Sequence, residues 1–363
     1  AMGFLSRKPK PAPIQVDEQH PIVEELQRME EAVPERRVAE SEPEPTPTPT
    51  PTPEPEAELR PEPVATATAA PVEVKPAEPE EPARMMPRDL IAPSRLDAAR
   101  EQAEPESPVK HADVIAFANQ KGGVAKTTTT LNLAVAFAES GYRVLCIDLD
   151  PQGNLTMSQG IDPDKVEKSL YDVLVNDMPI SEIIVKREID IAVASIDLAG
   201  AEIAMSTKIG RERSLEKALK EVDGDYDFIC IDTPPSLGLL TINALTVSNK
   251  VIVPVQCEYL SMRGLVQLQN TLKMIQENLN PDVKIEGILP TMLDARTVHA
   301  KEAVEILEEN FGDLVFKSRI RKAIKFAEAP VKGASVLKYD SGSSAANYYR
   351  ELAKEVLANG STQ

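Results

Sequence analysis

A glycine-rich turn with two lysines separates the first apolar run after residue 110 from a long helical pattern. Residues 119–128 read N-Q-K-G-G-V-A-K-T-T. Glycines allow backbone N–H groups to turn inward onto phosphate oxygens, and the N-terminus of the following helix adds partial positive charge. In such a turn Lys126 would reach the β- and γ-phosphates of a nucleotide, and the Thr127 hydroxyl would bind Mg²⁺. The turn therefore predicts a phosphate-binding loop.

The turn departs from the standard phosphate-loop pattern G-x-x-x-x-G-K-[ST], because Gln120 and Ala125 occupy the two glycine positions. Taken alone, the turn is also compatible with a chance Gly-Gly turn ahead of a helix. Evidence from other segments of the chain is needed to choose between a phosphate-binding loop and a chance turn.

Aspartates end two other apolar runs. Residues 144–154 read V-L-C-I-D-L-D-P-Q-G-N, and residues 228–236 read F-I-C-I-D-T-P-P-S. An aspartate at the end of a strand is often only a helix cap or a turn residue. Aspartates on two strands that flank a phosphate loop are better explained as ligands of Mg²⁺ and of a water molecule. The three segments together predict a nucleotide site.

Apolar runs alternate with amphipathic stretches after residue 112. The strand-like runs are 113–118, 142–147, 189–194, 228–231, 250–255, 284–289 and 314–316, and the helical stretches are 126–140, 211–222, 260–279, 297–310 and 345–357. This alternation predicts an α/β fold, with a mainly parallel twisted sheet flanked by helices on both faces. Ligands of such folds bind at the carboxyl ends of the strands.

The composition divides the chain into two parts. The chain has 363 residues and a formal net charge of −18, and 22 of its 31 prolines lie in residues 1–110. Proline at nearly every second position favours an extended chain, and few large apolar side chains are present to offset the entropy of ordering. We predict a disordered, acidic, proline-rich tail over residues 1–110, which could bind another protein or a scaffold. Residues 111–363 are predicted to form one globular domain.

Several classes of protein are excluded by the sequence. No stretch of 18 uninterrupted apolar residues is present, so no transmembrane segment is expected. The N-terminus lacks the apolar core of a secretion signal. Cys146, Cys230 and Cys257 each stand alone in an apolar run, which indicates core residues in a reduced cytosol rather than a disulfide framework or a metal pair. We expect a soluble, cytoplasmic protein.

Three motifs carry a resemblance to a known family. Residues 121–128 (K-G-G-V-A-K-T-T), 148–154 (D-L-D-P-Q-G-N) and 232–236 (D-T-P-P-S) resemble the deviant Walker motifs of the ParA/Soj partition ATPases. The resemblance continues through residues 239–245, 253–259 and 326–330, and covers the chain from residue 112 to about residue 358. It implies a P-loop NTPase fold of the deviant Walker type, with ATP and Mg²⁺ as cofactors.

The resemblance also implies a role for each site residue. Lys121 corresponds to the signature lysine, which reaches phosphates held by the partner subunit of an ATP-dependent homodimer. Lys126 and Asp150 complete the catalytic set, with Asp150 orienting the attacking water. The residues implied to contact the nucleotide are Lys121, Gly122, Gly123, Val124, Ala125, Lys126, Thr127 and Thr128. The residues implied to hold the metal are Thr127, Asp148 and Asp232.

The family's function follows from the same resemblance. It implies an ATPase that hydrolyses ATP to ADP and phosphate when a ParB-like partner stimulates it, binds DNA without sequence preference, and drives chromosome or plasmid segregation on the nucleoid. Residues 311–340 hold seven basic residues against three acidic ones. The candidate DNA contacts there are Lys317, Arg319, Arg321, Lys322, Lys325 and Lys332.

Two departures and several alternatives remain open at this point. Ala125 replaces a glycine beside the phosphates, and Arg321 and Ala323 stand where the family usually carries the proline and asparagine that frame adenine. A ParA-like ATPase could instead position a protein cargo such as a carboxysome or a chemoreceptor cluster. A MinD-like membrane ATPase would be expected to end in a basic amphipathic helix, an iron–sulphur carrier would need paired cysteines, and a scaffold would bind nucleotide without hydrolysis.

Overall fold

The computed structural model describes residues 111–257, 262–294, 296 and 298–360. The predicted tail and its possible partner lie outside these residues, as does the predicted boundary of the domain with that tail.

Seven strands form one sheet in the order β3-β4-β2-β5-β1-β6-β7, and every neighbouring pair is parallel except β3 with β4. The strands are β1 Asp113–Phe117, β2 Val144–Asp148, β3 Ile184–Lys186, β4 Asp190–Ala192, β5 Phe228–Asp232, β6 Lys250–Gln256 and β7 Lys284–Thr291. The central strands β2 and β5 are buried along their whole length. A sheet of this kind confirms the predicted mainly parallel α/β fold.

The two faces of the sheet carry two separate hydrophobic cores. In β1, Val114 and Ala116 join one core, whereas Ile115 and Phe117 join the other. Alternate residues of a strand point to opposite faces, so a strand buried on both sides is apolar throughout. Helices must therefore cover both faces.

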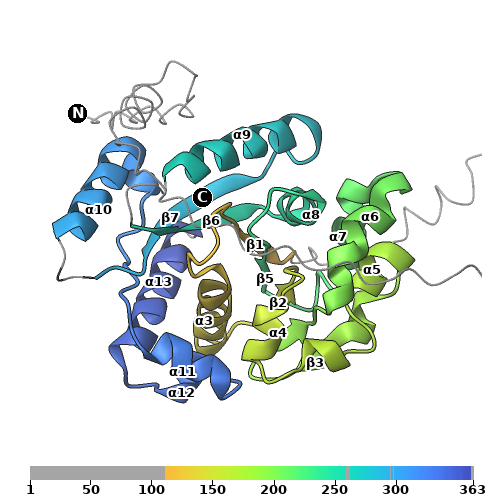
Figure 1. Cartoon of the computed structure of the whole chain (residues 1–363), viewed down its shortest axis with the longest axis horizontal. Helices are drawn as coiled ribbons and strands as arrows, with labels where there is room; N and C mark the ends of the chain where they lie inside the picture. The colour runs from red at the N-terminus through yellow and green to blue at the C-terminus, as the bar shows by residue number, and fades with distance from the viewer. Residues whose placement is uncertain (1–110, 258–261, 295, 297, 361–363) are drawn as a thin grey trace, which may run out of the picture. The chain divides into compact units, whose positions relative to one another are not determined.

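Figure 1 shows these helices on the two sides of the sheet. Helices α3 and α13 pack on one face, and α5, α7, α8, α9 and α10 contribute to the core on the other. The helices are α3 Lys126–Glu139, α4 Asn154–Ser158, α5 Leu170–Asn176, α6 Ala201–Ala204, α7 Ser214–Leu219, α8 Leu239–Val247, α9 Met262–Asn278, α10 Val298–Phe311, α11 Lys325–Val331, α12 Val336–Tyr339 and α13 Ser344–Gly360. Within the described residues, none of them has the length and apolar character that crossing a bilayer requires.

One predicted strand is wrong. Residues 314–316 do not extend the sheet: a 3-10 turn covers Gly312–Leu314, and Val315 makes only an isolated bridge to Ile288. The backbone N–H of Phe316 still donates to the carbonyl oxygen of Ile288 at 2.9 Å, but those of Lys317 and Ser318 donate to the two oxygens of the Glu355 carboxylate at 2.7 and 2.9 Å. A side chain of α13 therefore takes the hydrogen bonds that a neighbouring strand would have made.

Candidate functional site

The carboxyl ends of three neighbouring strands meet at one edge of the sheet. Phe117, the last residue of β1, is in register with Asp232 at the end of β5. Asp232 is in turn in register with Asp148 at the end of β2. The glycine-rich turn leaves β1 at this edge, so the fold brings together the three segments on which the sequence prediction depends.

The turn after β1 has the shape of an anion cradle. Gly123 and Ala125 both adopt left-handed backbone conformations, with φ of 73° and 66°, and α3 begins directly after Ala125. Among the hydrogen bonds between described residues, none is donated by the backbone N–H groups of Gly122, Gly123, Val124 or Ala125. Unused N–H donors ahead of a helix N-terminus are the groups that bind phosphate oxygens.

Ala125 is strained in this conformation, because an L-residue with a Cβ rarely adopts a left-handed backbone. We expect Ala125→Gly to raise the free energy of unfolding by about 0.5–1 kcal/mol, which is the relief of that strain less the extra chain entropy of glycine. Urea unfolding measures the change. Ala138→Gly, inside α3, is the matched control and should lower the same free energy by about 1 kcal/mol. A loss of stability in Ala125→Gly would contradict the strain.

Lys126 lies at the first position of α3 with only 7% of its surface exposed. Burial lowers its pKa, and the nearby Asp232 and Asp150 carboxylates oppose this shift. Burying an ammonium group is costly, and neither carboxylate forms an ion pair with Lys126 among the described residues, so a bound phosphate would supply a direct anionic partner. The burial of Lys126 therefore fits a phosphate ligand better than it fits a purely structural role.

Thr127 and Asp232 form a direct contact beside Lys126. The Thr127 hydroxyl donates to Oδ2 of Asp232 at 2.6 Å. Asp232 is fully buried, and its pKa is raised by burial first and by the neighbouring Asp148 second. A hydroxyl and a carboxylate in contact, beside the unused N–H groups of the loop, have the oxygen donors that Mg²⁺ prefers. The donor set therefore fits an Mg²⁺–nucleotide complex.

Asp148 is bound to the chain that follows it. Its Oδ2 accepts hydrogen bonds from the backbone N–H and the hydroxyl of Thr156, both at 2.7 Å. Its Oδ1 accepts the backbone N–H of Asp150 at 3.3 Å. Burial raises the pKa of Asp148 to about 6, although the hydrogen bonds from Thr156 act in the opposite direction. Asp148 therefore fixes the path of the segment that carries Asp150.

Asp150 is the second acidic residue of that segment and has 6% of its surface exposed. Its Oδ1 accepts the backbone N–H of Gln152 at 3.0 Å. Burial raises its pKa, and the charge of Lys126 acts against this rise. Oδ2 of Asp150 accepts no hydrogen bond from a described residue, which leaves an oxygen that could orient a water molecule.

The structure adds two residues that the sequence prediction did not single out. The Asn119 side chain donates to the carbonyl oxygen of Pro254 in β6 at 2.7 Å and accepts the backbone N–H of Lys121 at 3.0 Å. The hydroxyl of Thr291, at the end of β7, donates to the carbonyl oxygen of Val124 at 3.0 Å. Both side chains are buried and hold the loop from the neighbouring strands. Their signal in the sequence is a polar residue at the carboxyl end of an apolar run.

The six basic residues predicted to contact DNA fall into two groups. Arg319 forms an ion pair with Glu308, and Lys325 forms ion pairs with Glu328 at 3.2 Å and with Asp340 at 3.6 Å. The other four are exposed and make no ion pair with a described residue; they are Lys317, Arg321, Lys322 and Lys332. The second group is the better candidate for contacts with an external anion.

The cysteines do not form a metal site within the described part of the chain. Cys146 and Cys230 are buried neighbours on β2 and β5, and all three cysteines are free thiols. Burial raises the pKa of both buried thiols, so neither is prepared to act as a thiolate. No group of three or more His, Cys, Asp or Glu side chains that could hold a metal ion occurs among the described residues. The iron–sulphur alternative therefore has no support in these residues.

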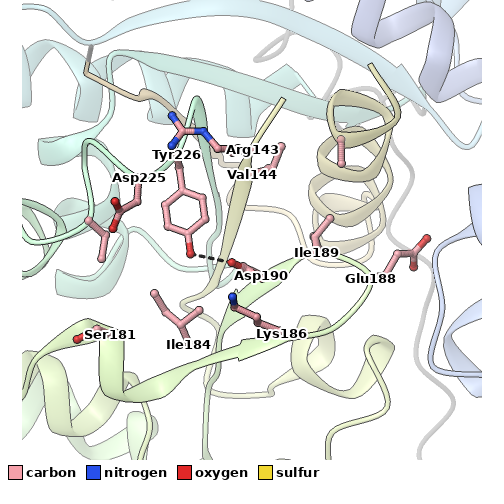
Figure 2. Close-up of a pocket in the computed structure, with 12 residues that line it drawn as sticks. Arg143, Val144, Ser181, Ile184, Lys186, Glu188, Ile189, Asp190, Asp225 and Tyr226 are labelled. Atoms are coloured by element: carbon pink, nitrogen blue, oxygen red, sulfur yellow. Dashed lines mark hydrogen bonds between the residues drawn. The ribbon is translucent and has the colours of Figure 1, made fainter. Parts of the chain in front are cut away.

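A cavity of ≈570 Å³ lies at the opposite edge of the sheet. Figure 2 shows it lined by Arg143 and Val144 at the start of β2, by Asp190 at the start of β4, and by Tyr226. The Tyr226 hydroxyl donates to Oδ2 of Asp190 at 2.9 Å. This cavity is formed at the amino ends of the strands, whereas the phosphate loop and the aspartates are at the carboxyl ends.

Comparisons with known proteins identify the family of the chain. Residues 112–285 match a family described as AAA domain. The sporulation initiation inhibitor protein Soj of Bacillus subtilis is 49% identical over 250 residues, which are 68% of this chain and 99% of Soj. The chromosome partitioning protein ParA of Myxococcus xanthus is 40% identical over 247 residues, 67% of this chain and 87% of that protein. The chain belongs to the ParA/Soj family.

A solved structure similar to this ParA/Soj chain holds a nucleotide analogue. The cobyrinic acid a,c-diamide synthase from Mycobacterium smegmatis, with a bound ATP analogue and magnesium, is 41% identical with a TM-score of 0.62. The match covers 69% of this chain and 96% of that one. The resemblance that the three motifs indicated is confirmed, as is the P-loop fold. Because this relative is named as a synthase, the family contains proteins named for different activities.

Proposed function

We propose that the chain is a ParA-type ATPase that binds ATP with Mg²⁺, hydrolyses it to ADP and phosphate, and uses the cycle to position a cargo. The observation that carries the proposal is the convergence of unused loop N–H groups, the buried Lys126 and the Thr127–Asp232 pair at one sheet edge. Relatives that bind an ATP analogue or ADP with magnesium support the choice of ligand.

Each residue has a chemical task in this proposal. The backbone N–H groups of Gly122, Gly123, Val124 and Ala125 would hold phosphate oxygens, with Lys126 on the β- and γ-phosphates. Thr127 and Asp232 would hold Mg²⁺, which supplies charge neutralisation at the phosphates, and Asp148 would support that shell. Thr128 completes the nucleotide contacts at the start of α3. Asp150 would orient the attacking water.

Lys121 would act in the partner subunit's site of an ATP-dependent homodimer. Lys121 lies in the loop directly before Gly122, and its backbone N–H donates to the side-chain oxygen of Asn119. A cation supplied in trans stabilises the negative charge of the transition state and makes hydrolysis depend on dimer formation. ATP would thus control the assembly of the dimer as well as the chemistry.

The cargo that we propose is a chromosome or a plasmid, carried on the nucleoid through non-specific DNA binding and released when a ParB-like protein stimulates hydrolysis. The names of the relatives Soj and ParA and the exposed basic residues Lys317, Arg321, Lys322 and Lys332 support this choice. A protein assembly such as a carboxysome or a chemoreceptor cluster would use the same ATPase cycle, so it is the alternative cargo.

Co-sedimentation of the full chain with duplex DNA tests the proposal. We expect binding to be at least about tenfold tighter with ATP than with ADP or without nucleotide, because the dimer doubles the phosphate contacts. The affinity should fall steeply between two salt concentrations. The control is a Lys126→Ala variant, which lacks the lysine assigned to the phosphates, so its DNA binding should not change when ATP is added. DNA binding that is equal in all nucleotide states, or missing in all of them, would contradict DNA as the nucleotide-controlled track.

A further inference from the structure

The outward face of α11 exposes apolar side chains. Ile324, immediately before α11, has 78% of its surface exposed, and Val331, its last residue, has 82%. Ala327 between them is also exposed. Ile324 has right-handed helical dihedral angles, so the three side chains follow the spacing i, i+3 and i+7. Residues with this spacing share one face of a helix, and seven residues place the outer two about 10 Å apart.

The fold itself does not need this stripe. The inner side of α11 is already packed: Ala329 is buried, and the ring of Phe326 meets the ring of Tyr349 edge-on with centroids 5.8 Å apart. Large aliphatic side chains that are mostly exposed on one face of a helix can mark a surface that another molecule covers.

Positive charge borders the stripe at both ends. Lys322 precedes it and Lys332 follows it, and both are exposed. Neither forms an ion pair with a described residue, although the charge of Lys322 contributes to the lowered pKa of Asp294. The acidic residue on the helix, Glu328, is neutralised by Lys325 at 3.2 Å and accepts the Tyr339 hydroxyl at 3.2 Å. The surface therefore offers two apolar contacts between two cations, which is complementary to a polyanion with apolar parts.

We propose that Ile324 and Val331 pack into a groove of duplex DNA while Lys322 and Lys332 contact the phosphates beside them. This inference rests on the DNA binding proposed above and adds an apolar component to it. The separation of about 10 Å spans roughly three base steps at 3.4 Å each. Proteins that bind DNA without reading its sequence use aliphatic side chains in this way in the minor groove. A helix of seven residues with two large aliphatic side chains would bury much less apolar area in a membrane than the longer amphipathic helices that bind bilayers.

The salt dependence of DNA binding separates the two kinds of contact. For the full chain with ATP, Ile324→Ser should weaken binding to duplex DNA about tenfold at every salt concentration, because apolar burial is lost. The slope of log K against log salt should stay unchanged. Lys322→Ala should instead reduce the magnitude of that slope by about 1.8, because each protomer of the ATP dimer loses one phosphate contact and each contact contributes about 0.9. Val331→Ser should weaken DNA binding to the same extent as Ile324→Ser. Agreement between the two variants would show that the loss does not come from a folding defect at one position.

Ile209→Ser is the matched control, since Ile209 has 95% of its surface exposed and belongs to another segment. It should leave both the affinity and the slope unchanged. Wild-type affinity in Ile324→Ser and Val331→Ser would overturn the inference while leaving DNA binding intact, whereas the proposed function fails only if the wild type itself shows no ATP-controlled binding. Loss of binding to phosphatidylglycerol vesicles in these variants, with DNA affinity unchanged, would assign the stripe to a membrane instead.

Discussion

Replacing Lys126 by alanine is expected to weaken ATP binding by about a hundredfold or more and to abolish hydrolysis. Lys126 is the buried charged residue of the loop and lies at the first position of α3. Charge-assisted hydrogen bonds from an ammonium group to a phosphate are strong in a buried site. Titration with a fluorescent ATP analogue in the presence of Mg²⁺ measures the change in affinity. Steady-state phosphate release measures the change in turnover.

The same substitution separates a binding role from a structural one. Burial lowers the pKa of Lys126, so its positive charge lowers the stability of the nucleotide-free fold. Lys126→Ala should therefore keep the free energy of unfolding of the apo protein, while losing the stabilisation that ATP gives to the wild type. Lys217→Ala, an exposed lysine on α7, is the control and should bind ATP normally. Unchanged ATP affinity in Lys126→Ala would contradict the proposed site.

The central part of the fold could be predicted from the sequence because its strands are buried on both faces. The runs that became β1, β2 and β5 are apolar throughout, and each ends at or near a polar residue of the site. In a parallel sheet these ends must meet at one edge. The pattern therefore predicted both the fold and the grouping of Lys126, Asp148 and Asp232.

Contacts between distant segments could not be predicted in the same way. Asn119 bonds to Pro254, and Thr291 bonds to Val124, across more than a hundred residues of chain. The error over residues 314–316 has the same origin, because Glu355 of α13 takes the N–H groups of Lys317 and Ser318, which would have continued a strand beyond this run. β3 is only three residues long and gives too short a pattern to be recognised.

The ion pairs of the surface cations also depend on distant segments and could not be predicted from the sequence. The six basic residues between positions 317 and 332 are equivalent in the sequence, but the fold pairs Arg319 with Glu308 and surrounds Lys325 with two carboxylates. Acidic partners on α10, on α11 and after α12 decide which cations remain available. The exposed stripe of α11 was likewise hidden in the sequence, because a short helix does not reveal which of its faces is covered.

Asp150→Ala is expected to lower ATP hydrolysis by about a hundredfold while leaving ATP affinity within about threefold of the wild type, because Asp150 is assigned to the water rather than to the phosphates. A protein that binds ATP but does not hydrolyse it should accumulate as the ATP dimer. Its DNA binding should therefore persist after the partner protein is added. Single-turnover phosphate release, nucleotide titration and sedimentation of the ATP-bound protein measure the three quantities.

Asp148→Ala is the matched control, because the two aspartates lie two residues apart and are both buried. Asp148 accepts the backbone N–H and the hydroxyl of Thr156. Its removal leaves these donors unpaired in the interior, so we expect a loss of about 2–3 kcal/mol in the free energy of unfolding. Asp150 accepts only the N–H of Gln152, at the partly buried edge of the site, so Asp150→Ala should keep nearly all of its stability. Wild-type hydrolysis in Asp150→Ala would show that Asp150 does not orient the water, and a loss of stability as large as that of Asp148→Ala would assign it a structural role.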